Sequence, residues 1–384
     1  MLDAWILKRR RTTLVVAISG LLVLACSPSG PGTVPSSVPG QSPAAATGPS
    51  QELLDAAKRD GVLTTMSLSH DRCDYGEVIR GFTERYGIAV NELNPIGDAG
   101  DQIDAIVATK DNPGPQTPDV IDVSMATALD NRELLEPYRV STWESIPTAL
   151  KDPDGAWYGA YFGTLAFETN TNLIADPPHD WPDLLDPALR GKVGLAGDPR
   201  GSNLAMETVY AAALANGGTA TDVVPGLTFF KRLVDLGNLS PTIARSNTID
   251  QGVTPIAIRW TYTALAHRDA AAGDPGIEVT VPSSGGVGGA FIQAINRYAP
   301  HPNAARLWIE HLLSDEGQRL LMEGSCTPAR IADLTARGAL PEGLLPGHPD
   351  TSRVTFPSPA DLETASTMIT QGWGPVTGFE FTDR

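Results

Sequence analysis

Apolar positions in the first part of the folded chain alternate between short runs and helical spacing. Ser50 and Gly61 are typical helix caps and predict a helix over 50–59. The next predicted elements are a strand over 62–68, a helix over 75–86 that ends at Gly87, a strand over 88–93, a helix around 103–107, a Pro-rich loop over 112–118 and a strand over 120–123. This βαβαβ order predicts parallel strands with right-handed crossovers.

A second α/β pattern follows further along the chain. It predicts an aromatic-rich extended segment over 155–170, a strand over 192–196, helices over 204–215 and 229–236, strands over 256–258 and 277–281, and a strong helix after Pro302. The chain beyond residue 330 is rich in Pro and Gly and gives no clear pattern. Each of the two patterns predicts an α/β region. A chain of 384 residues is long enough to form both as separate domains.

Composition narrows the class of protein. Hydrophobic residues make up 41% and charged residues 19% of the chain, which is typical of a globular protein. The net charge of −17 argues against a nucleic-acid partner, because phosphate binding needs a basic face.

The N-terminus has the pattern of an export signal. Four basic residues over 8–11 precede a mostly apolar run over 12–25, which is shorter than the roughly 20 residues of a membrane-spanning helix. The sequence Val-Leu-Ala before Cys26 resembles a lipobox, so residues 1–25 are interpreted as a lipoprotein signal peptide and Cys26 as the lipidated residue. The plainer alternative is an ordinary signal peptide with a chance cysteine.

The segment after Cys26 is interpreted as a tether. Residues 27–50 contain 6 Pro, 6 Ser and 4 Gly, a composition that cannot bury enough apolar surface to fold. A flexible chain of this length spans about 25–30 Å. Residues 26–50 are therefore expected to hold a folded domain away from a membrane, with the lipid anchor as the sole membrane attachment.

Two further cysteines, Cys73 and Cys326, remain in the folded part. Outside the cytoplasm an even pair favours a disulfide, which would connect early and late segments of the chain. Two buried free thiols are the alternative. A metal site is not expected, because neither a CxxC nor an HExxH spacing occurs.

Several ordered motifs resemble one family, the extracellular solute-binding proteins of ABC importers, in the group that includes ferric-iron, polyamine, thiamine and phosphonate binders. They are the helix over 53–61, Gly-Phe-Thr-Glu-Arg-Tyr-Gly-Ile over 81–88, Trp-Tyr-Gly over 157–159, Trp-Pro-Asp-Leu-Leu-Asp-Pro over 181–187 followed by Gly-Lys-Val over 191–193, and the segments 301–305 and 312–318. Together they cover about residues 51–330. They identify the scaffold and leave the ligand open.

The resemblance implies an α/β fold of the two-lobed periplasmic-binding-protein kind (type II), with a ligand cleft between the lobes. The first lobe would comprise 51–150 and 281–330, the second 151–280, and the segment 331–384 stays unassigned. The ligand would contact both lobes only when they are closed. Ligand binding would therefore shift the hinge between the lobes towards the closed form. The implied partners are a small polar solute and the permease subunits of an ABC importer. A monomer without cofactor, anchored outside the cytoplasmic membrane, is expected.

Ligands of open α/β sheets bind at the carboxyl ends of the strands. The turns that directly follow the predicted strands are therefore candidate ligand-binding segments. After the first strand, Ser67, Ser69 and His70 offer hydroxyl and imidazole groups, although a capped turn and a plain surface histidine are the alternatives. After the strand over 120–123, Thr127 is a candidate ligand residue, and the start of a helix is the alternative reading.

A third turn carries an anion-binding pattern. Its residues are Arg200, Gly201, Ser202 and Asn203. Backbone N–H groups before a helix and a guanidinium would both favour an anion, and relatives place ligand contacts at the matching turn. A plain N-cap by Ser202 is the alternative. Arg200 and Arg259 thus favour an anionic solute, whereas the acidic net charge favours a cation such as a polyamine.

Aromatic residues form the last set of candidates. Trp260 and Tyr262 follow a predicted strand and are suited to stacking on an organic cation or to packing in the core. Ferric-binding relatives carry two adjacent tyrosines in this region, whereas Tyr262 here lies between threonines, which disfavours ferric coordination. Tyr161 is placed at the hinge, and Ser283 in a Gly-rich hinge segment near the cleft.

Two other functions compete with transport. A secreted enzyme lacks support, because neither a GxSxG elbow, an HExxH motif nor a Walker A motif occurs in the sequence. A lipoprotein that uses the same scaffold for sensing or scaffolding is the remaining alternative.

Overall fold

The computed structural model describes residues 48–341, 344 and 353–382, which belong to one compact unit, Ala46–Arg384. Its α-helices are α1 (Gln51–Asp60), α2 (Tyr75–Tyr86), α3 (Ala99–Thr109), α4 (Met125–Asp130), α5 (Asn203–Ala215), α6 (Val224–Leu236), α7 (Ser246–Asp250), α8 (Thr261–Ala271), α9 (Pro302–Leu312), α10 (Asp315–Glu323), α11 (Ile331–Ala336) and α12 (Pro359–Thr377). Within these residues no helix combines the length and apolar character needed to cross a bilayer.

The strands are β1 (Val62–Met66), β2 (Ala89–Leu93), β3 (Val120–Ser124), β4 (Tyr158–Asn170), β5 (Val193–Leu195), β6 (Ile256–Trp260), β7 (Ile277–Thr280), β8 (Gly288–Ile295) and β9 (Thr327–Pro328). Short 3-10 helices are η1 (Arg132–Leu134), η2 (Trp143–Ser145), η3 (Thr148–Leu150), η4 (Trp181–Leu185) and η5 (Pro187–Leu189). The mixed α/β character expected from the sequence is confirmed. The predicted signal peptide, the lipidated Cys26 and most of the tether lie outside the described residues.

Local signals placed the first elements correctly. The Ser50 hydroxyl accepts a hydrogen bond from the Leu53 N–H at 3.2 Å, and Gly61 ends α1 with a left-handed backbone (φ 75°). Gly87 ends α2 in the same way. β1 and β2 then pair in parallel, as the βαβ pattern predicts.

The third strand corrects the prediction of continued parallel pairing. β3 pairs antiparallel with β8, and Asp122 lies opposite Gln293. Asp119, just before β3, binds β1 through two hydrogen bonds: its carboxylate accepts from the Thr64 N–H (2.6 Å), and its own N–H donates to the Thr64 carbonyl (2.8 Å). The strand that pairs with β3 is therefore one distant in sequence, whereas β1 contacts the start of β3.

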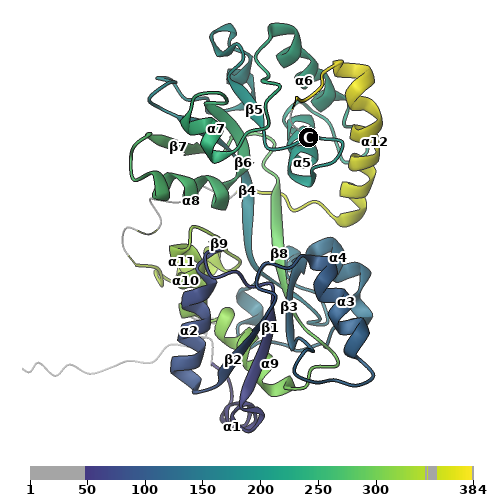
Figure 1. Cartoon of the computed structure of the whole chain (residues 1–384), viewed down its shortest axis with the longest axis vertical. Coiled ribbons are helices and arrows are strands. Elements are labelled where there is room, and N and C mark those ends of the chain that lie inside the picture. The colour runs from purple at the N-terminus through teal and green to yellow at the C-terminus, as the bar shows by residue number, and fades with distance from the viewer. Residues whose placement is uncertain (1–47, 342–343, 345–352, 383–384) are drawn as a thin grey trace, which may run out of the picture. The chain divides into compact units, whose positions relative to one another are not determined.

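The long strands β4 and β8 lie side by side and connect two groups of elements (Figure 1). In the described residues the larger sheet has the order β3-β8-β4-β6-β5, and β7 and β9 also pair with β4. Tyr158 and Tyr161 of β4 belong to one hydrophobic core, whereas Leu165 and Phe167 belong to another. One continuous strand thus links both cores.

The segment left unassigned from the sequence joins the second core. Ala365, Ile369 and Trp373 of α12 are fully buried there, and α12 packs on α5 and α6 (Figure 1). Trp373 lies 5.6 Å from Phe230 of α6 between ring centroids. Helix α12 therefore completes the apolar cover of α5 and α6.

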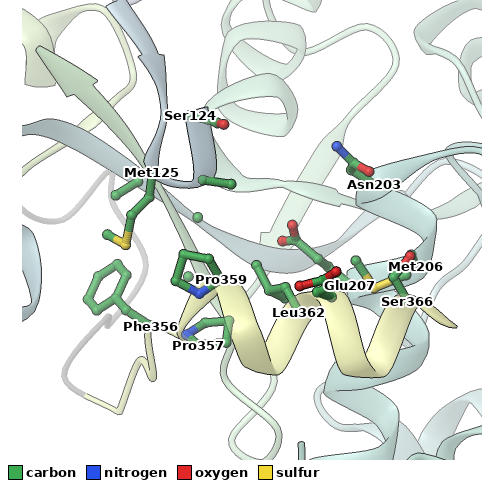
Figure 2. Close-up of a pocket in the computed structure, with 15 residues that line it drawn as sticks. Ser124, Met125, Asn203, Met206, Glu207, Phe356, Pro357, Pro359, Leu362 and Ser366 are labelled. Carbon is green, nitrogen blue, oxygen red and sulfur yellow. The ribbon is translucent and has the colours of Figure 1, made fainter. Parts of the chain in front are cut away.

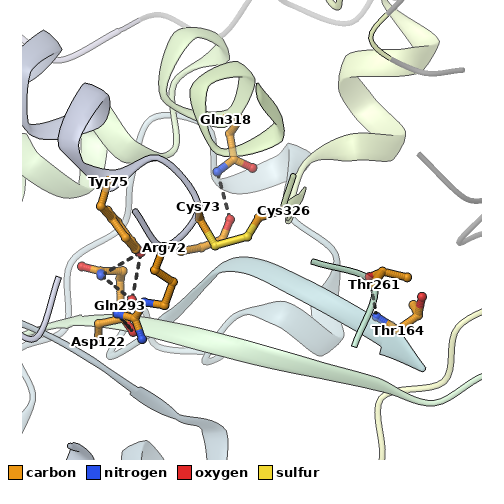
Figure 3. The surroundings of a disulfide bond; sticks show 10 residues. Arg72, Cys73, Tyr75, Asp122, Thr164, Thr261, Gln293, Gln318 and Cys326 are labelled. Atoms are coloured by element: carbon orange, nitrogen blue, oxygen red, sulfur yellow. Dashed lines mark hydrogen bonds and ion pairs between the residues drawn. A yellow bond between two sulfur atoms is a disulfide. The ribbon is translucent and has the colours of Figure 1, made fainter. Parts of the chain in front are cut away.

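A disulfide joins Cys73, just before α2, to Cys326, just before β9 (Figure 3). The two cysteines are 253 residues apart in sequence, and their Cα atoms are 5.3 Å apart. Both are buried within the first core. The bond therefore fixes the chain before α2 to the turn after α10.

Candidate functional site

A buried polar network lies beside the disulfide (Figure 3). Asp122 on β3 accepts hydrogen bonds from Arg72 (3.0 Å), Tyr75 (2.8 Å) and Gln293 (2.8 Å). Burial raises the pKa of Asp122, and these three donors oppose that rise. Arg72 also donates to the Ser67 carbonyl at 2.7 Å. The network holds the turn after β1 against β3 and β8.

Aromatic rings gather next to this network and include three predicted ligand residues. Tyr161 stacks on Phe291 with ring centroids 5.0 Å apart, and Tyr262 meets Tyr161 edge-on at 6.2 Å. Trp260 stacks on Tyr262 at 6.5 Å. Arg72 lies over Phe291, 5.5 Å from its centroid. The structure thus brings Tyr161, Trp260 and Tyr262 together on β4, the end of β6 and the start of α8.

Burial keeps both tyrosines of this cluster protonated. It raises the pKa of Tyr161 well above 10 and raises that of Tyr262 as well. The Tyr161 hydroxyl is buried and has no hydrogen-bond partner among the described residues. Both phenols are therefore neutral hydrogen-bond groups in this cluster. Among the described residues, no group of three or more His, Cys, Asp or Glu side chains could hold a metal ion.

A cavity of about 300 Å³ opens between α4, α5, β8 and α12 (Figure 2). It is lined by Ser124, Met125, Ala126, Asn203, Met206, Glu207, Gly288, Gly289, Ala290, Phe356, Pro357, Pro359, Leu362, Glu363 and Ser366. The volume is at the lower end of small-molecule sites, which span about 300–1,000 Å³. Most of the walls are apolar, and the polar groups are few, which is typical of such sites.

Glu207 is the charged residue of α5, whose other residues are apolar, small or neutral polar. Its Oε2 atom is buried and has no hydrogen-bond partner among the described residues. Burial raises the pKa of Glu207 from 4.5 to about 7. A buried carboxylate without a donor is costly, so this residue is poised to accept one from a bound molecule.

The candidates after β1 do not line this cavity. Ser67 is buried with a positive φ of 61°, and its hydroxyl has no hydrogen-bond partner among the described residues. The Ser69 hydroxyl donates to Asp71. His70 is an exposed histidine, 2.7 Å from Glu92. A ligand role for these three residues therefore stays a prediction, separate from this cavity.

The candidate residues near the starts of α4 and α5 differ in whether they line the cavity. Thr127 lies in the first turn of α4, where Ser124 accepts its N–H. Ser202 is the N-cap of α5 and accepts from the Ala205 N–H at 3.3 Å. Asn203, the next residue, lines the cavity, whereas Gly201 is exposed.

Arg200 and Ser283 point to other partners. Arg200 forms ion pairs with Asp198 (2.6 Å) and Glu380 (2.7 Å), so two carboxylates already neutralise its charge. Ser283 donates to Asp180 at 2.5 Å. The structure therefore gives neither side chain a free position in the cavity.

Sequence reasoning named the turn that contains Met125 but missed Glu207 and the α12 residues. A single carboxylate within an otherwise uncharged helix was a usable signal for Glu207. Phe356, Leu362 and Ser366 carried no comparable signal, because their place beside α5 depends on how the C-terminal segment packs.

A family model described as bacterial extracellular solute-binding protein matches residues 115–361. This range includes β3, both long strands, α5 and the beginning of α12. It therefore covers most of the residues that line the cavity.

Solved structures share the fold at low sequence identity. An extracellular solute-binding protein from Bordetella parapertussis is 14% identical with a TM-score of 0.67, over 83% of this chain and 99% of that one. Apo ferric ion-binding protein A of Pasteurella haemolytica is 18% identical (TM-score 0.62; 84% and 100% covered). A periplasmic binding protein of Actinobacillus pleuropneumoniae, with fructose-6-phosphate bound, is 20% identical (TM-score 0.56; 83% and 98%). These identities establish the fold and leave the ligand open.

Proposed function

Because the chain belongs to the family of bacterial extracellular solute-binding proteins, we propose that its solute binds in the cavity between α4, α5, β8 and α12. The chain is the solute-binding component of an ABC-type importer and acts outside the cytoplasm. The resemblance seen in the sequence is thereby confirmed. The observation that carries the proposed site is that the cavity is lined from two different cores: the second core and a further core around Ile121 and Val123 of β3.

Residues on opposite walls of the cavity belong to different cores. Met125 packs against the core that contains β3, whereas Met206 is buried in the core that contains α5. β4 and β8 cross between these cores. In the proposed mechanism the core around Ile121 and Val123 belongs to the first lobe expected from the sequence, and the second core, with α12 added, belongs to the second lobe. A solute that touches both walls stabilises the closed arrangement, because the open one offers it half of the contacts.

The proposal extends to the N-terminus. After cleavage, Cys26 carries the lipid, and the Pro-rich segment up to residue 50 keeps the binding unit near a permease in the membrane. Two signals support this arrangement: the lipobox-like residues and the composition of the segment. The net charge of −17 disfavours any other contact with anionic lipid. The protein acts as a monomer in this proposal.

The location of the site is tested by blocking the cavity with a large side chain on α12. Ser366→Trp places an indole in the cavity, whereas Thr367→Trp places the same group on the exposed neighbour outside it. Both variants and the parent are screened by thermal shift against amino acids, polyamines, sugar phosphates, phosphonates, thiamine and ferric citrate. A solute at 100 times its Kd adds about 2.7 kcal/mol to stability.

We expect at least one solute to raise the Tm of the parent and of Thr367→Trp but not that of Ser366→Trp. If Ser366→Trp responds like the parent, the cavity is not the site. A complete absence of response from the parent would contradict solute capture itself. Turnover of a solute, followed in the same samples, would instead favour an enzyme.

A further inference from the structure

The charges around the cavity have one sign. Among the described residues, the charged residues that line it are Glu207 of α5 and Glu363 of α12, and no Lys, Arg or His does. The nearby Arg200 is held by Asp198 and Glu380. Since unpaired carboxylates attract positive charge and repel anions, the cavity disfavours phosphate and carboxylate solutes.

Glu207 supplies an unused hydrogen-bond acceptor at the cavity wall. Its Oε2 atom is buried, and the described residues offer it no donor. Leaving such a group unpaired costs about 1–3 kcal/mol, and more when it is charged. A solute with a charged N–H donor would remove this cost on binding, which a solute without a donor cannot do.

The apolar walls of the cavity favour a solute with a hydrocarbon part. Met125, Met206, Phe356 and Leu362 present apolar surface, and flexible methionines adapt to different shapes. An organic cation with an apolar body matches both the walls and the charge.

We infer that the solute is a small organic ammonium ion whose protonated amine pairs with Glu207 while its hydrocarbon part lies against the apolar wall of α4, α5 and α12. This inference rests on the proposed function and names the solute class of that site. A cavity of about 300 Å³ limits the solute to small amines. Glu363, which is exposed at the rim, adds attraction at longer range.

Affinity should then depend on pH in a defined direction. Burial raises the pKa of Glu207 to about 7, and an alkylamine stays protonated below pH 9. Tyr262 of α8 interacts electrostatically with Glu207, Glu363 of α12 lines the same cavity, and the lining residues of α4 and β8 are not ionisable. Lowering the pH from 8 to 5 neutralises Glu207, so affinity falls by up to about 100-fold.

The test is calorimetric titration of the full chain at pH 8 with n-butylamine, cyclohexylamine, benzylamine and putrescine, and with the alcohols that match the first three. Glu207→Gln keeps the shape of the side chain and removes its charge. Glu363→Gln is the matched control, because it removes one charge at the exposed rim. The Tm of each unliganded variant shows that it is folded.

We expect at least one amine to bind, with at least 10-fold weaker binding to Glu207→Gln, at most about 3-fold weaker binding to Glu363→Gln, and no comparable binding of the matching alcohol. The inference fails if no amine binds, if an alcohol binds as tightly, or if Glu207→Gln binds like the parent. Should an anion or a neutral solute stabilise the parent while amines do not, solute capture stands and the ammonium class is wrong. If no solute of any class binds, both proposals fail.

Discussion

The ring of Tyr262 lies directly against the backbone of Gly163, across the pairing of β4 with the segment that starts α8. A Cβ atom built on Gly163 would be 2.6 Å from Cε1 of that ring, closer than side-chain atoms can approach. The absence of a side chain at Gly163 therefore allows Tyr262 to meet Tyr161 and Trp260.

Replacing this glycine should loosen the aromatic cluster. Gly163→Ala forces the Tyr262 ring away from β4, and overpacking of this kind costs about 1–3 kcal/mol. Denaturant unfolding followed by fluorescence measures the loss. Gly201→Ala is the control, because Gly201 is exposed and a Cβ there meets nothing within 4 Å, so a change within about 0.5 kcal/mol is expected. Equal effects of the two variants would contradict the close contact.

The disulfide between Cys73 and Cys326 should contribute strongly to stability. Its closed loop spans 253 residues, and removal of a native disulfide typically costs about 2–5 kcal/mol. The double variant Cys73→Ala/Cys326→Ala should unfold at lower urea concentration by that amount. Reductant should shift the midpoint of the parent and leave that of the double variant unchanged. A parent that does not respond to reductant after unfolding would show that the thiols are free.

Glu207 should destabilise the unliganded protein at neutral and alkaline pH. Its pKa is raised from 4.5 to about 7 in the folded state, so the neutral form is favoured by folding and stability is lost as pH rises through this window. Glu207→Gln should match the parent at pH 4 and exceed it by up to about 3 kcal/mol at pH 8. Comparing the two chains removes the contributions of other buried carboxylates such as Asp119 and Asp122, whose pKa values burial also raises.

The measurement is urea unfolding of both chains in steps of one pH unit from 4 to 8. A variant less stable than the parent at pH 8 would show that Glu207 has a partner in the folded state. Glu363→Gln, at the exposed rim, should change little across the same range.

Membrane attachment should depend on Cys26. Cys26→Ser blocks lipidation, so the protein should move from the membrane fraction to the soluble fraction of the expressing bacteria, while the Tm of the binding unit stays the same. Mass spectrometry of the parent should find a diacylated N-terminal cysteine. Retention of Cys26→Ser in the membrane fraction would argue for an uncleaved signal segment as the anchor.

Local features of the sequence were sufficient for much of the fold. The caps Ser50 and Gly61 bound α1, and apolar spacing marked α2 and α9, because helix ends and amphipathic faces depend on residues within a few positions of one another. The family motifs likewise depend on short ordered segments. These signals led to the α/β fold and the solute-binding family, both of which are confirmed.

Tertiary structure alone decided the pairing of β3 and the composition of the site. β8 takes the place beside β3 after a separation of more than 150 residues, and no local pattern reports such a partner. Helix α12 forms one wall of the cavity, and no local sequence pattern indicates that it packs there. The sequence determines that Glu207 is a lone carboxylate on an uncharged helix. Its burial, and hence its raised pKa, arises from elements distant in the chain, because desolvation depends on everything that packs around a group.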